Sequence, residues 1–198
     1  MHGRMIAAVV GALLPIVTGA QTSWLDDPGI QNRLSAGEVV LLTVLDRNEV
    51  RGRIKAAIRI NARSEAIWIV VTDCEHAPKF ILGLKRCSRI HVAPDGTWEL
   101  IEREIKYSWL MPTIHNIVRA DYKKPWRIDI KRVSGDLKDE EETWLLERAP
   151  DASSTIVEYE LYVEPGFWIP RWLVQRTLTH NLSDAMRALR TRVEGVQY

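Results

Sequence analysis

Apolar and polar residues alternate along much of the chain, which is the pattern of strands with one buried face. The clearest case is the segment 52–62, where Ile54, Ala56, Ile58 and Ile60 occupy every second position. An apolar stretch at 38–45 precedes it. Further strand patterns occupy 87–93, 97–110, 114–122, 126–134, 143–149 and 154–165. Short turns such as Pro94-Asp95-Gly96 separate them, so the sequence predicts a meandering antiparallel sheet.

Two segments have helical rather than strand spacing. Ser64 is a candidate helix N-cap before a short apolar helix, and the following segment 73–87 is a broken helical connection. A longer helix is predicted from about Pro170 to Glu194. Its apolar positions form one stripe, namely Leu182, Ala185, Met186, Leu189 and Val193. A sheet with one long amphipathic helix appended is an α+β arrangement.

The first 37 residues differ from the rest of the chain. Arg4 followed by an apolar stretch from Met5 to Val17, and by Thr18-Gly19-Ala20, is typical of a cleaved signal peptide at 1–20. The alternative is a membrane anchor, but the stretch is shorter than the roughly 20 residues that a spanning helix needs. Residues 21–37 are predicted to be an irregular lead-in to a single domain at 38–198. We therefore expect a periplasmic or secreted protein, cleaved near Ala20-Gln21.

The amino-acid composition limits the classes of molecule that the protein is expected to bind. The chain of 198 residues has a formal net charge of +1, which argues against nucleic-acid binding. Eight Trp and five Tyr stand against two Phe, and such amphipathic aromatic residues suit cavity linings and membrane-proximal surfaces. The acidic tract 135–142 lacks the spaced oxygen ligands of a calcium loop and is predicted to be a solvated hairpin.

Cys74 and Cys87 allow three interpretations. In an exported protein an even pair of cysteines favours a disulfide, while two free thiols are the first alternative. A metal site with His76 and His91 is the second alternative, but the spacing matches no standard zinc signature. We predict the disulfide, and no metal or cofactor.

The order and spacing of these elements resemble the START-like superfamily, which comprises polyketide cyclase/dehydrase and lipid-transport proteins. The resemblance covers roughly Val50 to Val196 and is carried by IRINARSEAIWIVVTDCEHAPKFILGLK, by Thr143-Trp144, and by STIVEYELYVEPGFWIPRWLVQRTL. The coenzyme Q-binding group is the most similar branch. The resemblance implies a helix-grip fold, in which a curved antiparallel sheet wraps around the long C-terminal helix, with a short helical hairpin after the first core strand. It also implies a deep cavity for a lipid, quinone or polycyclic ligand.

Strand alternation indicates which side chains face that cavity. Along 101–109, Ile101, Arg103, Ile105, Tyr107 and Trp109 share the more apolar face. Arg103 or Arg132 could then meet a headgroup or carboxylate, although arginines that extend from a packed core to its rim are an equally simple interpretation. The predicted ligand-binding residues are Trp68, Phe80, Arg103, Tyr107, Trp109, Tyr122, Trp126, Arg132, Trp144, Tyr159, Trp172 and Leu182.

Three functions remain open at this stage. The first is a binder or carrier of a hydrophobic molecule. The second is a cyclase or dehydratase that uses His115 with Tyr107 as acid–base groups in the cavity. The absence of any standard catalytic motif argues against this second function. The third is an interaction module, in which Trp168, Arg171 and Trp172 contact a membrane surface or a protein.

Overall fold

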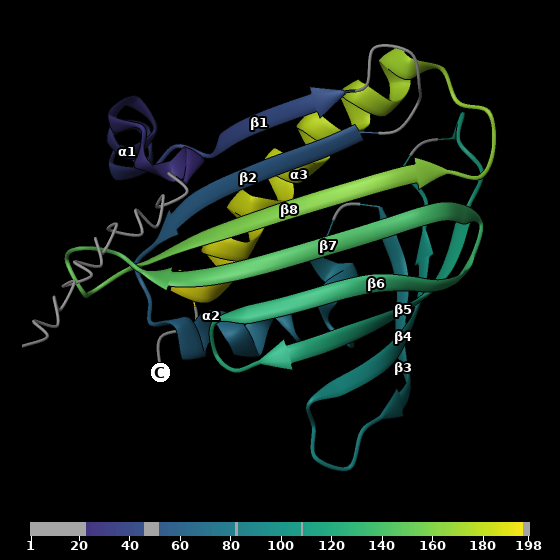
Figure 1. Cartoon of the computed structure of the whole chain (residues 1–198), viewed down its shortest axis with the longest axis horizontal. Coiled ribbons are helices and arrows are strands. Elements are labelled where there is room, and N and C mark those ends of the chain that lie inside the picture. The colour runs from purple at the N-terminus through teal and green to yellow at the C-terminus, as the bar shows by residue number, and fades with distance from the viewer. Residues whose placement is uncertain (1–22, 46–51, 82, 108, 196–198) are drawn as a thin grey trace, which may run out of the picture.

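The computed structural model describes residues 23–45, 52–81, 83–107 and 109–195. The predicted signal peptide 1–20 and its cleavage site lie outside the described residues. The elements are η1 (Trp24–Asp26), α1 (Pro28–Ser35), β1 (Val40–Leu45), β2 (Gly52–Ile60), α2 (Ser64–Val71), η2 (Ala77–Lys79), β3 (Leu84–Val92), β4 (Trp98–Ile105), β5 (Ile114–Lys123), β6 (Arg127–Gly135), β7 (Leu137–Arg148), β8 (Thr155–Pro165) and α3 (Arg171–Gly195) (Figure 1).

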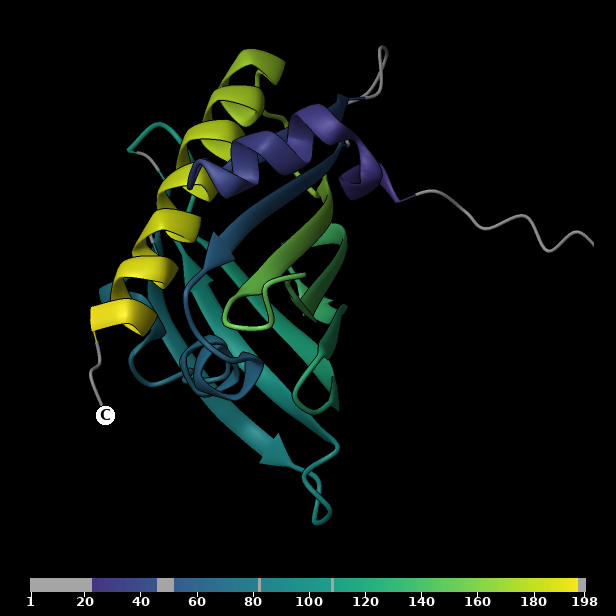
Figure 2. The same cartoon turned by 90° about the vertical axis from the view of Figure 1, so that its left-hand side faces the viewer.

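The strands form one eight-stranded antiparallel sheet in the order β1-β2-β8-β7-β6-β5-β4-β3. The segment from β3 to β8 is the predicted meander, and β2 then pairs with β8. The sheet curves strongly, and α3 crosses its concave side near β2 (Figures 1 and 2). The predicted α+β helix-grip architecture is confirmed.

The apolar stripe of α3 explains its position. Met186, Leu189 and Val193 are buried, and they pack against the inward side chains Ile58 and Ile60 of β2. Burying side chains of this size typically contributes about 1.5–3 kcal/mol each, so the stripe fixes the helix across the sheet.

The segment 21–37, predicted to be irregular, contains two short helices in its described part, η1 and α1. The Asp27 side chain accepts hydrogen bonds from the backbone N–H groups of Gly29 (2.8 Å) and Ile30 (3.1 Å), and Pro28 occupies the first turn of α1. Leu34 of this helix packs with Ala57, which lies on the opposite face of β2 from Ile58. This short helix therefore covers the convex face of the sheet, where β1 and β2 pair (Figure 2).

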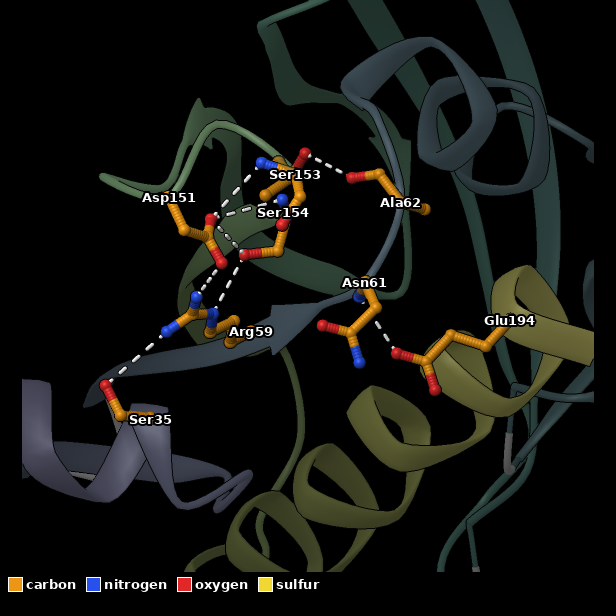
Figure 3. Close-up of polar contacts among 9 residues, drawn as sticks. Ser35, Arg59, Asn61, Ala62, Asp151, Ser153, Ser154 and Glu194 are labelled. Carbon is orange, nitrogen blue, oxygen red and sulfur yellow. Dashed lines mark hydrogen bonds and ion pairs between the residues drawn. The ribbon is translucent and has the colours of Figure 1, made fainter.

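One end of the sheet is tied together at residues 59–62, which we call the β2 junction. Arg59 forms an ion pair with Asp151 in the β7–β8 turn and reaches Ser35 of α1 at 3.5 Å. The backbone N–H of Asn61 donates to Glu194 of α3 at 2.9 Å (Figure 3). Three segments that are distant in sequence are therefore attached to the end of one strand, β2, which lies next to the edge strand β1.

The hairpin predicted for the acidic tract is present, because β6 ends at Gly135 and pairs antiparallel with β7, but the tract is not solvated throughout. β7 begins at Leu137 and runs through the tract, so that its residues alternate between the two faces of the sheet. Lys138 and Glu141 are exposed, whereas Glu140 and Glu142 are buried on the concave side. Two carboxyl groups are thereby brought into the interior.

Candidate functional site

A cavity of about 190 Å³ lies between α3 and the concave face of the sheet. Most of its wall is apolar, with Ile101 and Ile105 from β4 and Ile128 and Ile130 from β6. This composition, with a few polar groups, is the usual form of a small-molecule site. Seven of the predicted ligand-binding residues line it, namely Phe80, Arg103, Tyr107, Tyr122, Trp144, Tyr159 and Leu182.

The structure places the other five away from the cavity wall. Trp109 is 85% exposed because β4 ends at Ile105 and strand alternation no longer applies beyond it. Trp126, 59% exposed, lies in the turn before β6. Trp172 is 62% exposed on the first turn of α3. None of the three lines the cavity, so the inward-facing side chain predicted for Trp109 and Trp126 was wrong, and a role of Trp172 in ligand binding stays a prediction.

The remaining two residues are enclosed differently. Trp68 is buried in the core behind the wall, where its ring and that of Tyr122 form a T-shaped pair with centroids 5.6 Å apart. Arg132 lies near the end of β6 and donates to the backbone oxygen of Gly135 at 2.9 Å. Arg132 therefore caps a strand end and is not part of the cavity wall.

The predicted catalytic pair is not assembled. His115 lies on β5 beside Asn116, and the alternation of the strand exposes His115 while Asn116 is buried. Tyr107 lines the cavity from the other side of the sheet, and its ring packs on Gly83, whose φ of +89° suits a residue without a side chain. The two side chains therefore lie on opposite faces of the sheet, so they do not form one site.

A charged cluster lies inside the cavity. Arg103 of β4 places Nη1 2.7 Å from Glu142 Oε1 and Nη2 3.1 Å from Glu140 Oε1. All three side chains are largely enclosed, at 14% exposure for Arg103 and 6% for each glutamate. Breaking such a buried ion pair is strongly destabilising because it leaves a charge uncompensated.

Neutral groups complete this cluster. Asn116 donates to Glu140 Oε2 at 2.9 Å, and Tyr159 Oη donates to Glu142 Oε2 at 3.0 Å. Burial, together with the charges of Glu140 and Glu142, raises the pKa of Tyr107 to about 12. Burial also raises the pKa of Glu140, although the guanidinium of Arg103 opposes that effect. The tyrosines are thus neutral hydrogen-bonding groups at physiological pH.

Two donor atoms of Arg103 have no hydrogen-bond partner among the described residues. Among the described residues nothing accepts a hydrogen bond from Arg103 Nε, which is buried, and the contact from Nη2 to Glu140 lacks hydrogen-bond geometry. An unpaired buried donor costs about 1–3 kcal/mol, and in native structures it commonly marks a place where another molecule supplies the acceptor.

Sequence reasoning identified Arg103 but missed its partners. Glu140 and Glu142 belong to a run of four consecutive acidic residues, and such a run is typical of a solvent-exposed turn. Spacing is the signal that could have found them, because positions 140, 142, 144 and 146 share one face of a strand that continues into Trp144 and Leu146.

Cys74 and Cys87 form a disulfide, as predicted, with a Cα–Cα distance of 5.4 Å. Both residues line the cavity, so the bond joins the segment after α2 to the edge strand β3 at the cavity wall. Within the described ranges no cluster of His, Cys, Asp and Glu could hold a metal ion. In the same ranges, no helix has the length and apolarity needed to cross a membrane.

Residues 60–190 match the sequence profile of the family described as polyketide cyclase / dehydrase and lipid transport. The chain belongs to this family. No curated protein matches the chain at a significant level. The match covers the elements from the end of β2 through most of α3, which are the elements that enclose the cavity.

Solved structures share the fold of this family member at low sequence identity. A STAR-related lipid transfer protein from Xanthomonas axonopodis is 15% identical, with a TM-score of 0.67, and the alignment covers 79% of this chain and 93% of that chain. A START superfamily protein from Mycobacterium smegmatis is 21% identical, with a TM-score of 0.61 and coverage of 81% and 100%. The Zhui aromatase/cyclase of a Streptomyces species is 10% identical, with a TM-score of 0.61 and coverage of 78% and 94%.

Proposed function

We propose that this protein binds or carries a neutral hydrophobic small molecule, whose polar end lies against the Arg103 cluster. The observation that carries the proposal is an apolar cavity lined by Arg103, whose guanidinium retains buried donors, Nε and Nη2, without a hydrogen-bond partner among the described residues. A carbonyl or hydroxyl oxygen of a ligand would satisfy such a donor while the apolar body occupies the rest of the cavity. Lipids, quinones and polycyclic ketones all have this character.

Charge supports a neutral ligand over an acid. Arg103 already faces two carboxyl groups, Glu140 and Glu142, and no other basic residue lines the cavity among the described residues. A ligand carboxylate placed there would be repelled by both groups and would lose its own hydration. We therefore propose that Arg103 contacts a neutral oxygen of the ligand and not the ligand carboxylate expected from the sequence.

The test begins with the protein purified gently from the producing organism. Native mass spectrometry followed by analysis of an organic extract should reveal one stoichiometric, neutral, apolar molecule. Titration of ligand-free protein with decanol and decanoic acid should then favour the alcohol. A folded protein that retains no apolar molecule and binds neither probe would contradict the proposal.

Export and membrane contact form a second part of this proposal. The disulfide suits an oxidising compartment. Trp168 is 85% exposed, and the adjoining Met111, Ile169 and Leu173 form a buried cluster that joins the segment carrying Trp168 and Trp172 to the segment carrying Trp109. Exposed Trp side chains on one surface favour the interface of a lipid bilayer. The Arg171 side chain, also predicted to contact the membrane, lies outside the described residues.

Flotation with vesicles tests the membrane contact. The mature protein should float with anionic phospholipid vesicles, and a Trp168→Ala/Trp172→Ala variant should remain in solution. Trp126→Ala is the matched control because it removes an exposed Trp from another part of the molecule. Equal flotation of all three proteins would exclude this surface as the contact.

A cyclase or dehydratase activity is the second candidate function, now without His115. Glu140 has a raised pKa and an electrostatic interaction with Tyr107, so a proton could be exchanged inside the cavity. If the extracted molecule is a substrate, Glu140→Gln should stop its conversion while binding persists. Recovery of the molecule unchanged after incubation with the native protein would exclude this candidate.

A further inference from the structure

The cavity contains a second polar group at a distance from the first. Along β4 the residues at alternate positions Glu99, Ile101, Arg103 and Ile105 all line the cavity. Strands rise about 3.3 Å per residue, so the Cα atoms of Glu99 and Arg103 are separated by about 13 Å along the strand. Ile101 lies between them, and the cavity therefore has a polar group towards each end of one apolar surface.

Glu99 has its own hydrogen-bond partners, independent of the Arg103 cluster. Its carboxyl group accepts a hydrogen bond from Tyr122 Oη and forms an ion pair with Arg89 Nε at 3.1 Å. Arg89 in turn donates to the backbone oxygen of Thr72, which follows α2. Glu99 is only 4% exposed, so this carboxylate is held inside the protein by named partners.

The carboxylate of Glu99, which lines the cavity, retains unused hydrogen-bonding capacity. A carboxylate has about four acceptor positions, and Glu99 uses one from each oxygen for Tyr122 and Arg89. Tyr122 and Thr72 also line the cavity beside Glu99. The group can thus accept a hydrogen bond from a ligand hydroxyl, whereas the guanidinium of Arg103, with Nε and Nη2 unpartnered among the described residues, can donate one.

We propose that the natural ligand is an elongated neutral molecule with oxygen functions at both ends: a hydroxyl or carbonyl at Arg103, and a hydroxyl at Glu99. Long-chain diols and hydroxyketones belong to this class. The inference rests on the proposed binding function and specifies its ligand. The apolar surface between the two ends, formed by Ile101, Ala120, Ile128 and Ile130, requires an apolar middle section.

The geometry also predicts whether the protein donates or accepts the hydrogen bond at each end of the ligand. The Arg103 end supplies a donor, so it accepts ketones and alcohols alike. The Glu99 end supplies acceptors and disfavours a ketone, because two facing acceptors leave both without a hydrogen bond. A hydroxyketone would consequently bind in one orientation, with its hydroxyl at Glu99.

Calorimetric titration with α,ω-diols from octanediol to tetradecanediol, each compared with the mono-alcohol of equal chain length, tests this inference. Near one optimal length the diol should bind roughly tenfold more tightly than its mono-alcohol, as expected for one hydrogen bond to a charged group. Glu99→Gln weakens the acceptor, so this advantage should largely disappear while affinity for the mono-alcohol is retained. Glu102→Gln is the matched control, because Glu102 lies on the outer face of the same strand.

The outcomes separate the two proposals. Equal affinity of diols and mono-alcohols at every length, or an advantage unchanged in Glu99→Gln, would overturn the two-ended ligand and leave the binding function intact. Failure of both series to bind would count against the binding function itself, and the further inference would fall with it. Thermal unfolding of Glu99→Gln shows whether any loss of affinity merely reports loss of fold.

Discussion

Arg103 on β4 and Glu142 on β7 meet inside the cavity, with Nη1 2.7 Å from Oε1, although β5 and β6 lie between their strands in the sheet. Three steps between neighbouring strands correspond to about 14 Å along a flat sheet. The curvature of the sheet brings these two faces towards each other (Figure 2), so that the ion pair forms across the cavity side of the sheet.

Removing the cation should destabilise the fold. Arg103→Met leaves Glu140 and Glu142 buried without their counter-ion, and the loss of a partner from a buried pair typically costs about 3–5 kcal/mol. Urea unfolding followed by circular dichroism measures the change. The variant Arg103→Met/Glu140→Gln/Glu142→Met should recover at least half of the loss. A triple variant as unstable as the single one would show that the burial of charge is not the cause.

Glu140 should make stability depend on pH. Its folded pKa is raised above 4.5 by burial, so the folded protein holds this proton at pH values where the unfolded chain has released it. Its contribution is therefore fully present below pH 4.5 and decreases as pH rises through the folded pKa. The native protein should therefore lose stability as pH rises over this window, whereas Glu140→Gln should not lose this contribution. The free energy of unfolding of the variant minus that of the native protein should accordingly increase with pH. A difference that stays constant with pH would contradict the shift.

Loss of the disulfide should lower stability without altering the fold. The bond joins Cys74 and Cys87 across a separation of 13 residues, for which the chain-entropy model gives about 3 kcal/mol. Cys74→Ser/Cys87→Ser should be less stable by this amount in denaturant titrations. Reductant should bring the native protein to the same value and leave the variant unchanged. Two titratable thiols in the native protein without reductant would show that the bond is absent.

Filling the cavity should abolish binding while retaining the fold. Ala185 lines the cavity from α3, so Ala185→Phe places a ring in the space assigned to the ligand. Affinity for decanol should fall at least tenfold by calorimetry. Asp184→Phe is the control, since Asp184 is exposed on the same helix and its pair with Arg187 lies at the surface. Unchanged binding to Ala185→Phe would place the ligand elsewhere.

The sequence alone was sufficient to predict the elements with regular periodicity. The apolar stripe of the long helix and the alternation in 52–62 have the periods of the structures that they form, and the disulfide followed from an even pair of cysteines. The family resemblance was confirmed by the profile match. The similarity to the coenzyme Q-binding branch of the family stays a prediction.

The errors have two different physical origins. Trp109 and Trp126 were assigned by extending strand alternation past positions where the backbone leaves the sheet, at Ile105 and before Arg127. Glu140 was missed for the opposite reason, because its polarity is compensated only by a partner 37 residues earlier, Arg103. The residues around Glu140 do not indicate such a partner, so the burial of this charge could not be predicted without the three-dimensional structure.

The β2 junction has a consequence for how the molecule moves. Arg59 and Asn61 attach the β7–β8 turn, α1 and the C-terminal part of α3 to a single strand end, so these parts can separate only if several contacts break at once. Opening motions that admit a ligand should therefore occur at the opposite end, around Met111 and Ile169. Amide hydrogens near the junction should accordingly exchange with solvent only through global unfolding, whereas those at the other end should exchange through local fluctuations.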